Sequence, residues 1–205
     1  MKDVAVVYSG SAQHQRTFNE PKYRRYIDDL LYLPELADVD LSEYRALILP
    51  TRMHSALVER AEPVVLDFLA RGGTVVAFGD QHHDWLPGSH YEYRPTNFWW
   101  WLEPGARSGL EVANDRHSIF RHMGLDDATW HQHGVFYPEP GADVAIRTED
   151  GGAVLYTDDV SGAPGRLVMT TLDPDYHYGA HFMPATERFL DRFFPWLDEM
   201  LRAGR

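Results

Sequence analysis

Residues 71–79 read Arg71-Gly72-Gly73-Thr74-Val75-Val76-Ala77-Phe78-Gly79, so a glycine pair leads directly into a short apolar run. Glycine often ends a helix, and an unbroken β-rich run is typical of a strand buried on both faces. The preceding apolar positions, Leu57 to Leu69, recur at helical spacing, and Pro63 either bends that helix or begins its main body. A second apolar run, residues 46–50, comes before the helix. Residues 46–79 are therefore predicted to form a strand, helix, strand unit of a parallel sheet.

The same alternation extends to both sides of this unit. Residues 4–8 form another apolar run, and the apolar positions of residues 19–31 fit a helix that Pro34 ends. Towards the other terminus we expect an antiparallel hairpin over 144–147 and 153–156, a last core strand over 167–172, and a final helix over 186–202 that Pro195 bends.

These elements favour an α/β fold, specifically a flavodoxin-like three-layer α/β/α sandwich with a mostly parallel central sheet. Regular periodicity fades between residues 80 and 143, which we interpret as an aromatic-rich insertion with some local helix near residues 117–123. No linker or repeat divides the 205 residues, and this length suits one hydrophobic core. We expect a single domain over residues 1–205.

The composition excludes several classes of function. Nineteen basic against 31 acidic residues give a net charge of −12, so we expect no nucleic-acid partner. There is no export signal at the N-terminus and no apolar stretch long enough to span a bilayer, which predicts a cytoplasmic protein without a membrane partner. Cysteine is absent, which excludes disulfides, thiolate metal sites and cysteine nucleophiles.

Polar side chains gather where the predicted strands end, and ligands of open α/β sheets bind beyond the carboxyl ends of the strands. Six of the eleven histidines fall at this predicted edge. We assign catalytic candidates and ligand-binding candidates here. The catalytic candidates are Asp80, His82, Asp173 and His177; the ligand-binding candidates are Ser9, His14, His54, Gln81, His83, Trp85, Trp99 and His181.

The turn at residues 79–85 offers no serine or cysteine nucleophile, and Asp80 is either a nucleophile or a cap on the following turn. Imidazole and carboxylate also suit zinc, iron and manganese. Three stretches supply such ligands, and a divalent metal is therefore one interpretation, with its ligands left open. They are His82-His83-Asp84, His131-Gln132-His133 and the pair His177 and His181, which would share one face of a helix.

Trp99-Trp100-Trp101 is the centre of the densest aromatic region. Such rings stack on sugars or bases, and they also pack in subunit interfaces. Trp85 or one of these tryptophans would supply a stacking wall for a ligand. The competing interpretation is a homodimer contact.

Four segments together resemble a known group of proteins. They are Tyr44 to Pro50, Arg71 to Gly79, Asp115-Arg116-His117-Ser118-Ile119-Phe120, and Gly165 to Leu172. The order of these segments and their residue patterns resemble those of the class I glutamine amidotransferase-like superfamily, and within it those of ThuA-like (trehalose-utilisation) proteins. The resemblance implies the layered α/β fold already predicted.

The catalytic part of this resemblance is missing. Amidotransferases of that group carry a cysteine after the third strand and a His-x-Glu pair after the last one, whereas this chain has Gln81 or a neighbour and Asp173-Pro174-Asp175 at those places. The resemblance implies a glutaminase-inactive protein that binds a small polar ligand, such as a carbohydrate derivative, and that could act as a hydrolase. The alternative is a non-catalytic interaction module whose aromatic insertion forms a protein–protein interface.

Overall fold

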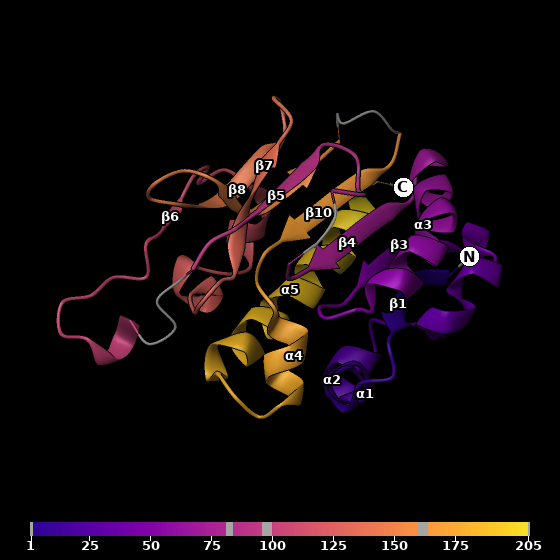
Figure 1. Ribbon diagram of the computed structural model, residues 1–205, viewed down its shortest axis with the longest axis horizontal. Coiled ribbons are helices and arrows are strands. Elements are labelled where there is room, and N and C mark those ends of the chain that lie inside the picture. The colour runs from indigo at the N-terminus through magenta and orange to yellow at the C-terminus, as the bar shows by residue number, and fades with distance from the viewer. Residues whose placement is uncertain (1, 81–83, 96–99, 160–163, 205) are drawn as a thin grey trace.

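The fold was analysed in a computed structural model, which describes residues 2–80, 84–95, 100–159 and 164–204. Within these residues the strands form one mixed sheet of ten, with helices on both faces (Figure 1). Along its main path the strand order is β2-β1-β3-β4-β10-β9-β7-β5, and β8 joins β9 and β6. The α/β class predicted from the sequence is therefore confirmed.

One half of the sheet is parallel. Its strands are β1 (Lys2–Tyr8), β2 (Asp29–Tyr32), β3 (Tyr44–Leu49), β4 (Thr74–Phe78) and β10 (Arg166–Thr170). All neighbouring pairs in this half are parallel, and every residue of β4 is buried. The carboxyl ends of these five strands therefore lie at one edge, as the predicted unit around residues 46–79 requires.

The other half is antiparallel, so the expectation of a mostly parallel sheet was wrong. Its strands are β5 (Ser89–Tyr93), β6 (Leu110–Val112), β7 (Gly134–Pro138), β8 (Asp143–Thr148) and β9 (Ala153–Asp158). The predicted hairpin is confirmed as β8 and β9, and β9 also pairs antiparallel with β10. Three of these strands come from the segment interpreted as an irregular insertion. Short strands of mixed polarity pair there because tertiary neighbours complete their ladders.

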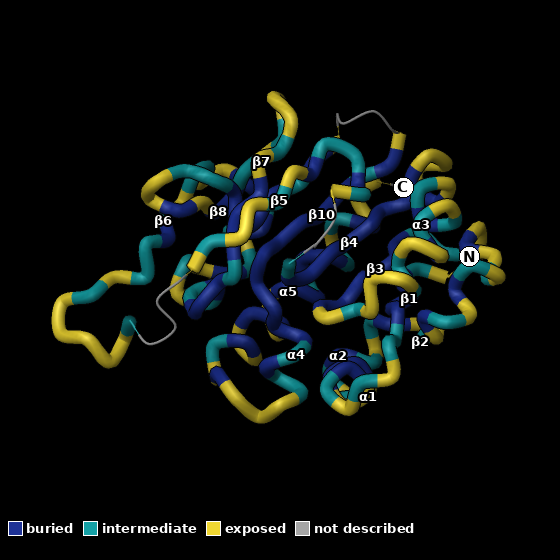
Figure 2. The backbone as a smooth tube through the Cα atoms, viewed as in Figure 1, coloured by how far each residue is buried: buried dark blue, intermediate teal, exposed yellow. Residues whose placement is uncertain are grey.

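Two hydrophobic cores cover the two faces of the parallel strands. Alternate residues point to opposite faces, so Val75 and Ala77 of β4 pack with α3 (Ser55–Ala70), whereas Val76 and Phe78 pack with α5 (Pro184–Ala203). Figure 2 shows the central strands as the most continuously buried part of the chain. Both predicted helices are confirmed, and each contains its proline, Pro63 or Pro195.

The predicted helix over residues 19–31 is wrong. Residues 12–19 form α1 (Ala12–Asn19), four residues form α2 (Pro21–Arg24), and the apolar pair Leu30 and Leu31 belongs to β2. Two adjacent apolar residues are too few for periodicity to distinguish the end of a helix from a short strand. Parallel pairing with β1, from Ala5 opposite Asp29 to Tyr8 opposite Tyr32, favours the strand.

A short helix, α4 (Pro174–Gly179), follows β10 and packs against α1. The remaining helical pieces are single 3₁₀ segments over Leu33–Asp38, Leu41–Glu43, Trp100–Leu102, Ser118–Arg121 and Leu125–Ala128. The segment Ser118–Arg121 lies within the local helix expected near residues 117–123.

Candidate functional site

Asp173 lies just beyond the carboxyl end of β10, where the chain leaves the sheet and enters α4. Pro174 occupies the first turn of α4, a position that suits the fixed φ of proline. The buried Asp173 side chain does not cap the helix. Its Oδ1 instead accepts a hydrogen bond from Trp130 Nε1 at 3.2 Å. The second carboxylate oxygen is left for other partners.

His131 and His133 lie just before the start of β7 and approach Asp173 from there. Phe136 of β7 is paired with Ala153, and Thr170 of β10 is paired with Leu155, two residues further along β9. The start of β7 and the end of β10 therefore flank the start of β9. This topology brings residues 131–133 beside Asp173, 40 positions later in the sequence.

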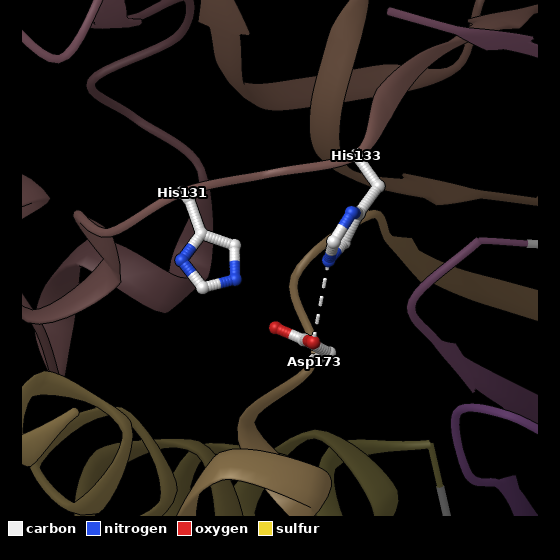
Figure 3. Close-up of side chains that lie close together, drawn as sticks. All are labelled: His131, His133 and Asp173. Atoms are coloured by element: carbon white, nitrogen blue, oxygen red, sulfur yellow. Dashed lines mark ion pairs between the residues drawn. The ribbon is translucent and has the colours of Figure 1, made fainter. Parts of the chain in front are cut away.

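Four titratable side chains converge there. Asp173 Oδ2 lies 3.1 Å from His177 Nε2 and 3.6 Å from His133 Nε2. His177 Nε2 also lies 3.0 Å from His131 Nε2, so one of these two rings donates a hydrogen bond to the other. Figure 3 shows His131 and Asp173 on two separate segments, with His133 directed at the carboxylate. We call His131, His133, Asp173 and His177 the histidine–aspartate cluster.

The cluster has the composition of a metal site. One ligand atom from each of His131, His133 and Asp173 lies within 4.8 Å of the other two. Two imidazoles and one carboxylate form a ligand set found in catalytic zinc centres, in which three protein ligands leave one coordination position for water or substrate. The residues therefore fit a divalent ion, with a modest contraction of the side chains around it.

The charge state of the cluster also favours metal binding. Burial lowers the pKa of His131 to about 4, against the opposing charge of Asp173 and with the help of nearby His177, His133 and Arg52. Burial by itself would raise the pKa of Asp173, but the imidazoles of His133 and His177 outweigh it and hold that pKa below its usual range. At neutral pH the cluster therefore contains a neutral His131 and an ionised Asp173, the forms that bind metal ions.

The depressed pKa of His131 predicts acid sensitivity of the fold. Between pH 6.5 and about 4 the unfolded chain binds a proton at His131 that the folded chain does not, so stability falls as the pH falls through this window. The expected loss is about 3 kcal/mol, measured as the free energy of urea unfolding at a series of pH values. The variant His131→Gln should show a smaller loss over the same window. An identical slope in both proteins would contradict the assignment.

A second group of polar side chains links the ends of β1 and β10. Ser9 Oγ is 2.9 Å from His14 Nδ1, and His14 Nε2 is 3.3 Å from Asp175 Oδ2. That same oxygen accepts hydrogen bonds from Thr51, from the backbone N–H at 2.9 Å and from Oγ1 at 3.2 Å. Thr17 Oγ1 donates to the backbone carbonyl of Asp175 at 2.6 Å. We call Ser9, His14 and Asp175 the serine–histidine–aspartate chain.

The structure places the other predicted site residues as follows. Asp173 and His177 belong to the histidine–aspartate cluster, and Ser9 and His14 belong to the serine–histidine–aspartate chain. His54 is exposed ahead of α3, and Trp85 packs partly buried against the α3 face of the core. Asp80 is half-buried directly after Gly79. Gln81, His82, His83 and Trp99 lie outside the described residues.

His181 does not share a helix face with His177. The helix α4 ends at Gly179, and His181 has a left-handed backbone with φ of 58° and an exposed side chain. The two rings therefore cannot form the i,i+4 metal pair that a longer helix would have supplied.

The aromatic insertion is partly exposed. Trp101 is 40% and Leu102 69% exposed, whereas Trp100 is half-buried and lines a cavity of about 300 Å³ together with Gln132. Trp100 therefore lies near the segment that carries His131 and His133. The homodimer interpretation of this region stays a prediction.

A larger cavity, of about 630 Å³, lies at the opposite edge of the sheet, where β3, β4 and β10 begin. Its arginines already have acidic partners: Arg71 pairs with Asp67 at 2.7 Å, and Arg166 pairs with Asp159. We place the site at the carboxyl edge, because buried titratable groups converge there and not in this larger cavity.

Comparison with known proteins gives the fold a name. No family model matches the chain, and no curated protein matches its sequence. Among solved structures, a cytoplasmic protein of Salmonella typhimurium LT2 is 12% identical with a TM-score of 0.60, and the match covers 99% of both chains. A ThuA-like protein of Bacteroides uniformis is 14% identical with a TM-score of 0.55, covering 95% of this chain and 90% of that one.

A glutamine amidotransferase of Thermotoga maritima is also similar, at 12% identity and a TM-score of 0.56 over 98% of this chain and 87% of that one. The chain has the class I glutamine amidotransferase-like, ThuA-like fold. The predicted resemblance is confirmed at the level of the fold. Because the chain has no cysteine, this amidotransferase-like fold lacks the thiolate that thioester chemistry requires.

In the described part of the chain, no helix combines the length and the apolar character needed to cross a bilayer.

Proposed function

We propose that the protein binds a divalent metal ion in the histidine–aspartate cluster and, on it, a small polar ligand of the carbohydrate-derivative class. The single observation that carries the proposal is the convergence of His131, His133 and Asp173 at the carboxyl edge of the sheet. Ligands of open α/β sheets bind at this edge. The similarity to a ThuA-like protein supports the ligand class, because the resemblance to the trehalose-utilisation group implies a carbohydrate derivative as the ligand.

The same cluster supports hydrolysis as the reaction type. A divalent ion bound by three protein ligands supplies Lewis acidity to a water or substrate oxygen. The residues of the chain would bind the ion and transfer protons. His177 Nε2 faces Asp173 and His131, and an imidazole in this position can accept or donate a proton. Trp130 holds Asp173 in place through its Oδ1.

The first test is metal stoichiometry. Protein freed of metal with a chelator and then titrated with Zn²⁺ or Mn²⁺ should bind one ion per chain by calorimetry, and mass spectrometry should find the same ratio after dialysis. A matched control is His90→Ala, because His90 is an exposed histidine whose side chain pairs with Asp84 and stacks on Tyr137, outside the histidine–aspartate cluster. This variant should bind metal like the parent protein.

The ligand is tested on the metal-loaded protein. Saturation-transfer NMR with a panel of monosaccharides, disaccharides and sugar acids should detect binding that disappears when the metal is removed. Failure to bind one ion of either metal would overturn the proposed function. Binding of a sugar equally well with and without metal would contradict the placement of the ligand on the ion.

A further inference from the structure

We propose that Ser9, His14 and Asp175 form a separate catalytic centre, in which Ser9 is the nucleophile of a metal-independent hydrolysis of small, negatively charged esters. The three side chains come from the turn after β1, from α1 and from α4. Ser9 Oγ is hydrogen-bonded to Nδ1 of His14 at 2.9 Å, and Asp175 Oδ2 lies 3.3 Å from the other ring nitrogen, an ion-pair distance at which no hydrogen bond forms. This centre does not depend on the proposed metal site.

The environment of Asp175 selects the reactive form of His14. The Asp175 carboxylate is fully buried, and Thr51 fixes Oδ2 with two hydrogen bonds. A carboxylate 3.3 Å from Nε2 favours, by its charge, the His14 tautomer that carries its proton on that nitrogen, and Nε2 forms no hydrogen bond within the described residues. The lone pair is then on Nδ1, which faces Ser9 Oγ. His14 is thereby oriented as a base for the Ser9 hydroxyl.

The pattern of burial fits an active nucleophile. His14 is 1% exposed and Asp175 is fully buried, whereas Ser9 is half-buried and is the member of the chain that solvent can reach. In a buried environment the attraction between Asp175 and a protonated His14 is stronger than in water. The two nitrogens of His14 have exchanged the roles they take in the serine protease triad, but the roles of nucleophile, base and orienting carboxylate are preserved.

Local structure does not explain the contact between Ser9 and His14. The N-cap of α1 is already supplied by Ser11, whose Oγ accepts the backbone N–H of His14 at 3.1 Å. Ser9 therefore does not cap this helix. Asp175 Oδ1 and His14 Nε2 are both buried without a hydrogen-bond partner within the described residues, so the carboxylate and the imidazole are held at a cost that a purely structural tie does not require.

Arg52 indicates the charge of the substrate. It follows Thr51, the residue that holds Asp175, and it has a left-handed backbone with φ of 55°. Its guanidinium lies 3.9 Å from the ring centroid of Tyr176, the neighbour of Asp175 in sequence. No carboxylate in the described ranges forms an ion pair with this exposed arginine. A cation held on the ring of Tyr176, the residue next to Asp175 in sequence, suits an ester that carries a carboxylate or phosphate group.

The reaction proceeds in two balanced steps. Ser9 Oγ attacks the ester carbonyl carbon while its proton moves to His14 Nδ1, and the bond from that carbon to the alcohol oxygen then breaks. The leaving alkoxide takes the proton from His14, which gives the free alcohol and an acyl group on Ser9. Water attacks this acyl group, His14 accepts the water proton and returns it to Ser9 Oγ, and the carboxylic acid leaves.

The test measures hydrolysis of 4-nitrophenyl acetate and of its anionic analogue, mono-4-nitrophenyl succinate, in the presence of EDTA. We expect turnover of both esters, with a higher kcat/KM for the succinate. Ser9→Ala should lower kcat by at least about 100-fold. The matched control is Ser55→Ala, because Ser55 is an exposed serine at the start of α3 and does not belong to the serine–histidine–aspartate chain. The Ser55→Ala variant should hydrolyse both esters like the parent protein.

Covalent labelling gives a readout that does not depend on a variant. A fluorophosphonate should add its mass to the peptide containing Ser9 in the full-length protein, and only there. Absence of both labelling and turnover, or turnover unchanged in Ser9→Ala, would overturn the proposal. Because EDTA is present throughout, these outcomes are separate from a failure of metal binding, which would affect the proposed function alone.

Discussion

Replacing Asp173 by Asn is expected to weaken metal binding by at least about 100-fold, which corresponds to about 2.7 kcal/mol. The substitution removes the only carboxylate of the three candidate ligands and leaves two imidazoles. The fold should survive, because the amide oxygen of asparagine can still accept the hydrogen bond from Trp130 Nε1. The measurement is calorimetric titration of the chelator-treated variant with Zn²⁺.

The variant His133→Ala completes this test. His133 is less buried than Asp173 but is a partner of that buried carboxylate, so its loss should lower both stability and metal affinity. Thermal unfolding in the presence and absence of Zn²⁺ separates the two effects, because metal that binds only the folded protein raises its Tm. If both variants bind Zn²⁺ as tightly as the parent, the cluster is not the metal site.

Gly179→Ala is expected to destabilise the protein by about 3 kcal/mol, a value typical of severe overpacking. A Cβ atom on Gly179 would lie 2.2 Å from the backbone oxygen and 2.6 Å from the Cα of Gln13. These are backbone atoms of α1, so no rotation of a side chain relieves the clash, and α1 must move away from α4. Urea unfolding followed by circular dichroism measures the loss.

Gly204→Ala is the matched control for this prediction. Gly204 has a negative φ of −85°, and its nearest atoms would be 3.9 Å from an added Cβ. Its substitution should change stability by less than about 0.5 kcal/mol. Because His14 lies on α1 and Asp175 on α4, Gly179→Ala should also reduce ester hydrolysis in the folded protein. A variant as stable as the parent would show that the two helices can separate without cost.

Elements with a strong local pattern were predicted from the sequence. The strand β4, residues 74–78, coincides with the β-rich run that follows the glycine pair Gly72-Gly73, because an unbroken run of this kind is typical of a strand buried on both faces. The final helix and the hairpin of β8 and β9 are also confirmed, because helical spacing and a turn between two apolar runs are local signals as well. The region from 80 to 143 was not predicted, since its strands are short and depend on partners distant in sequence.

The candidate site was predicted only in part. Asp173 and His177 were identified because they follow the last parallel strand, where the topology of an α/β sheet places ligands. His131 and His133 were noticed as a pair of metal ligands but could not be located. The sequence around these two histidines has no regular pattern, so it does not show that the start of β7 and the end of β10 lie on either side of the start of β9.

The sequence by itself determined the parallel core, the two covering helices, and the absence of any thiolate chemistry. These properties depend on local periodicity and on composition, which are independent of how distant segments meet. Tertiary structure alone decided that the sheet is mixed, and that two histidines before β7 meet an aspartate after β10. It likewise joined Ser9 and His14 to Asp175, more than 160 positions away from each. Such contacts follow from strand pairing and helix packing between remote segments, where a side chain's neighbours are set by the whole fold.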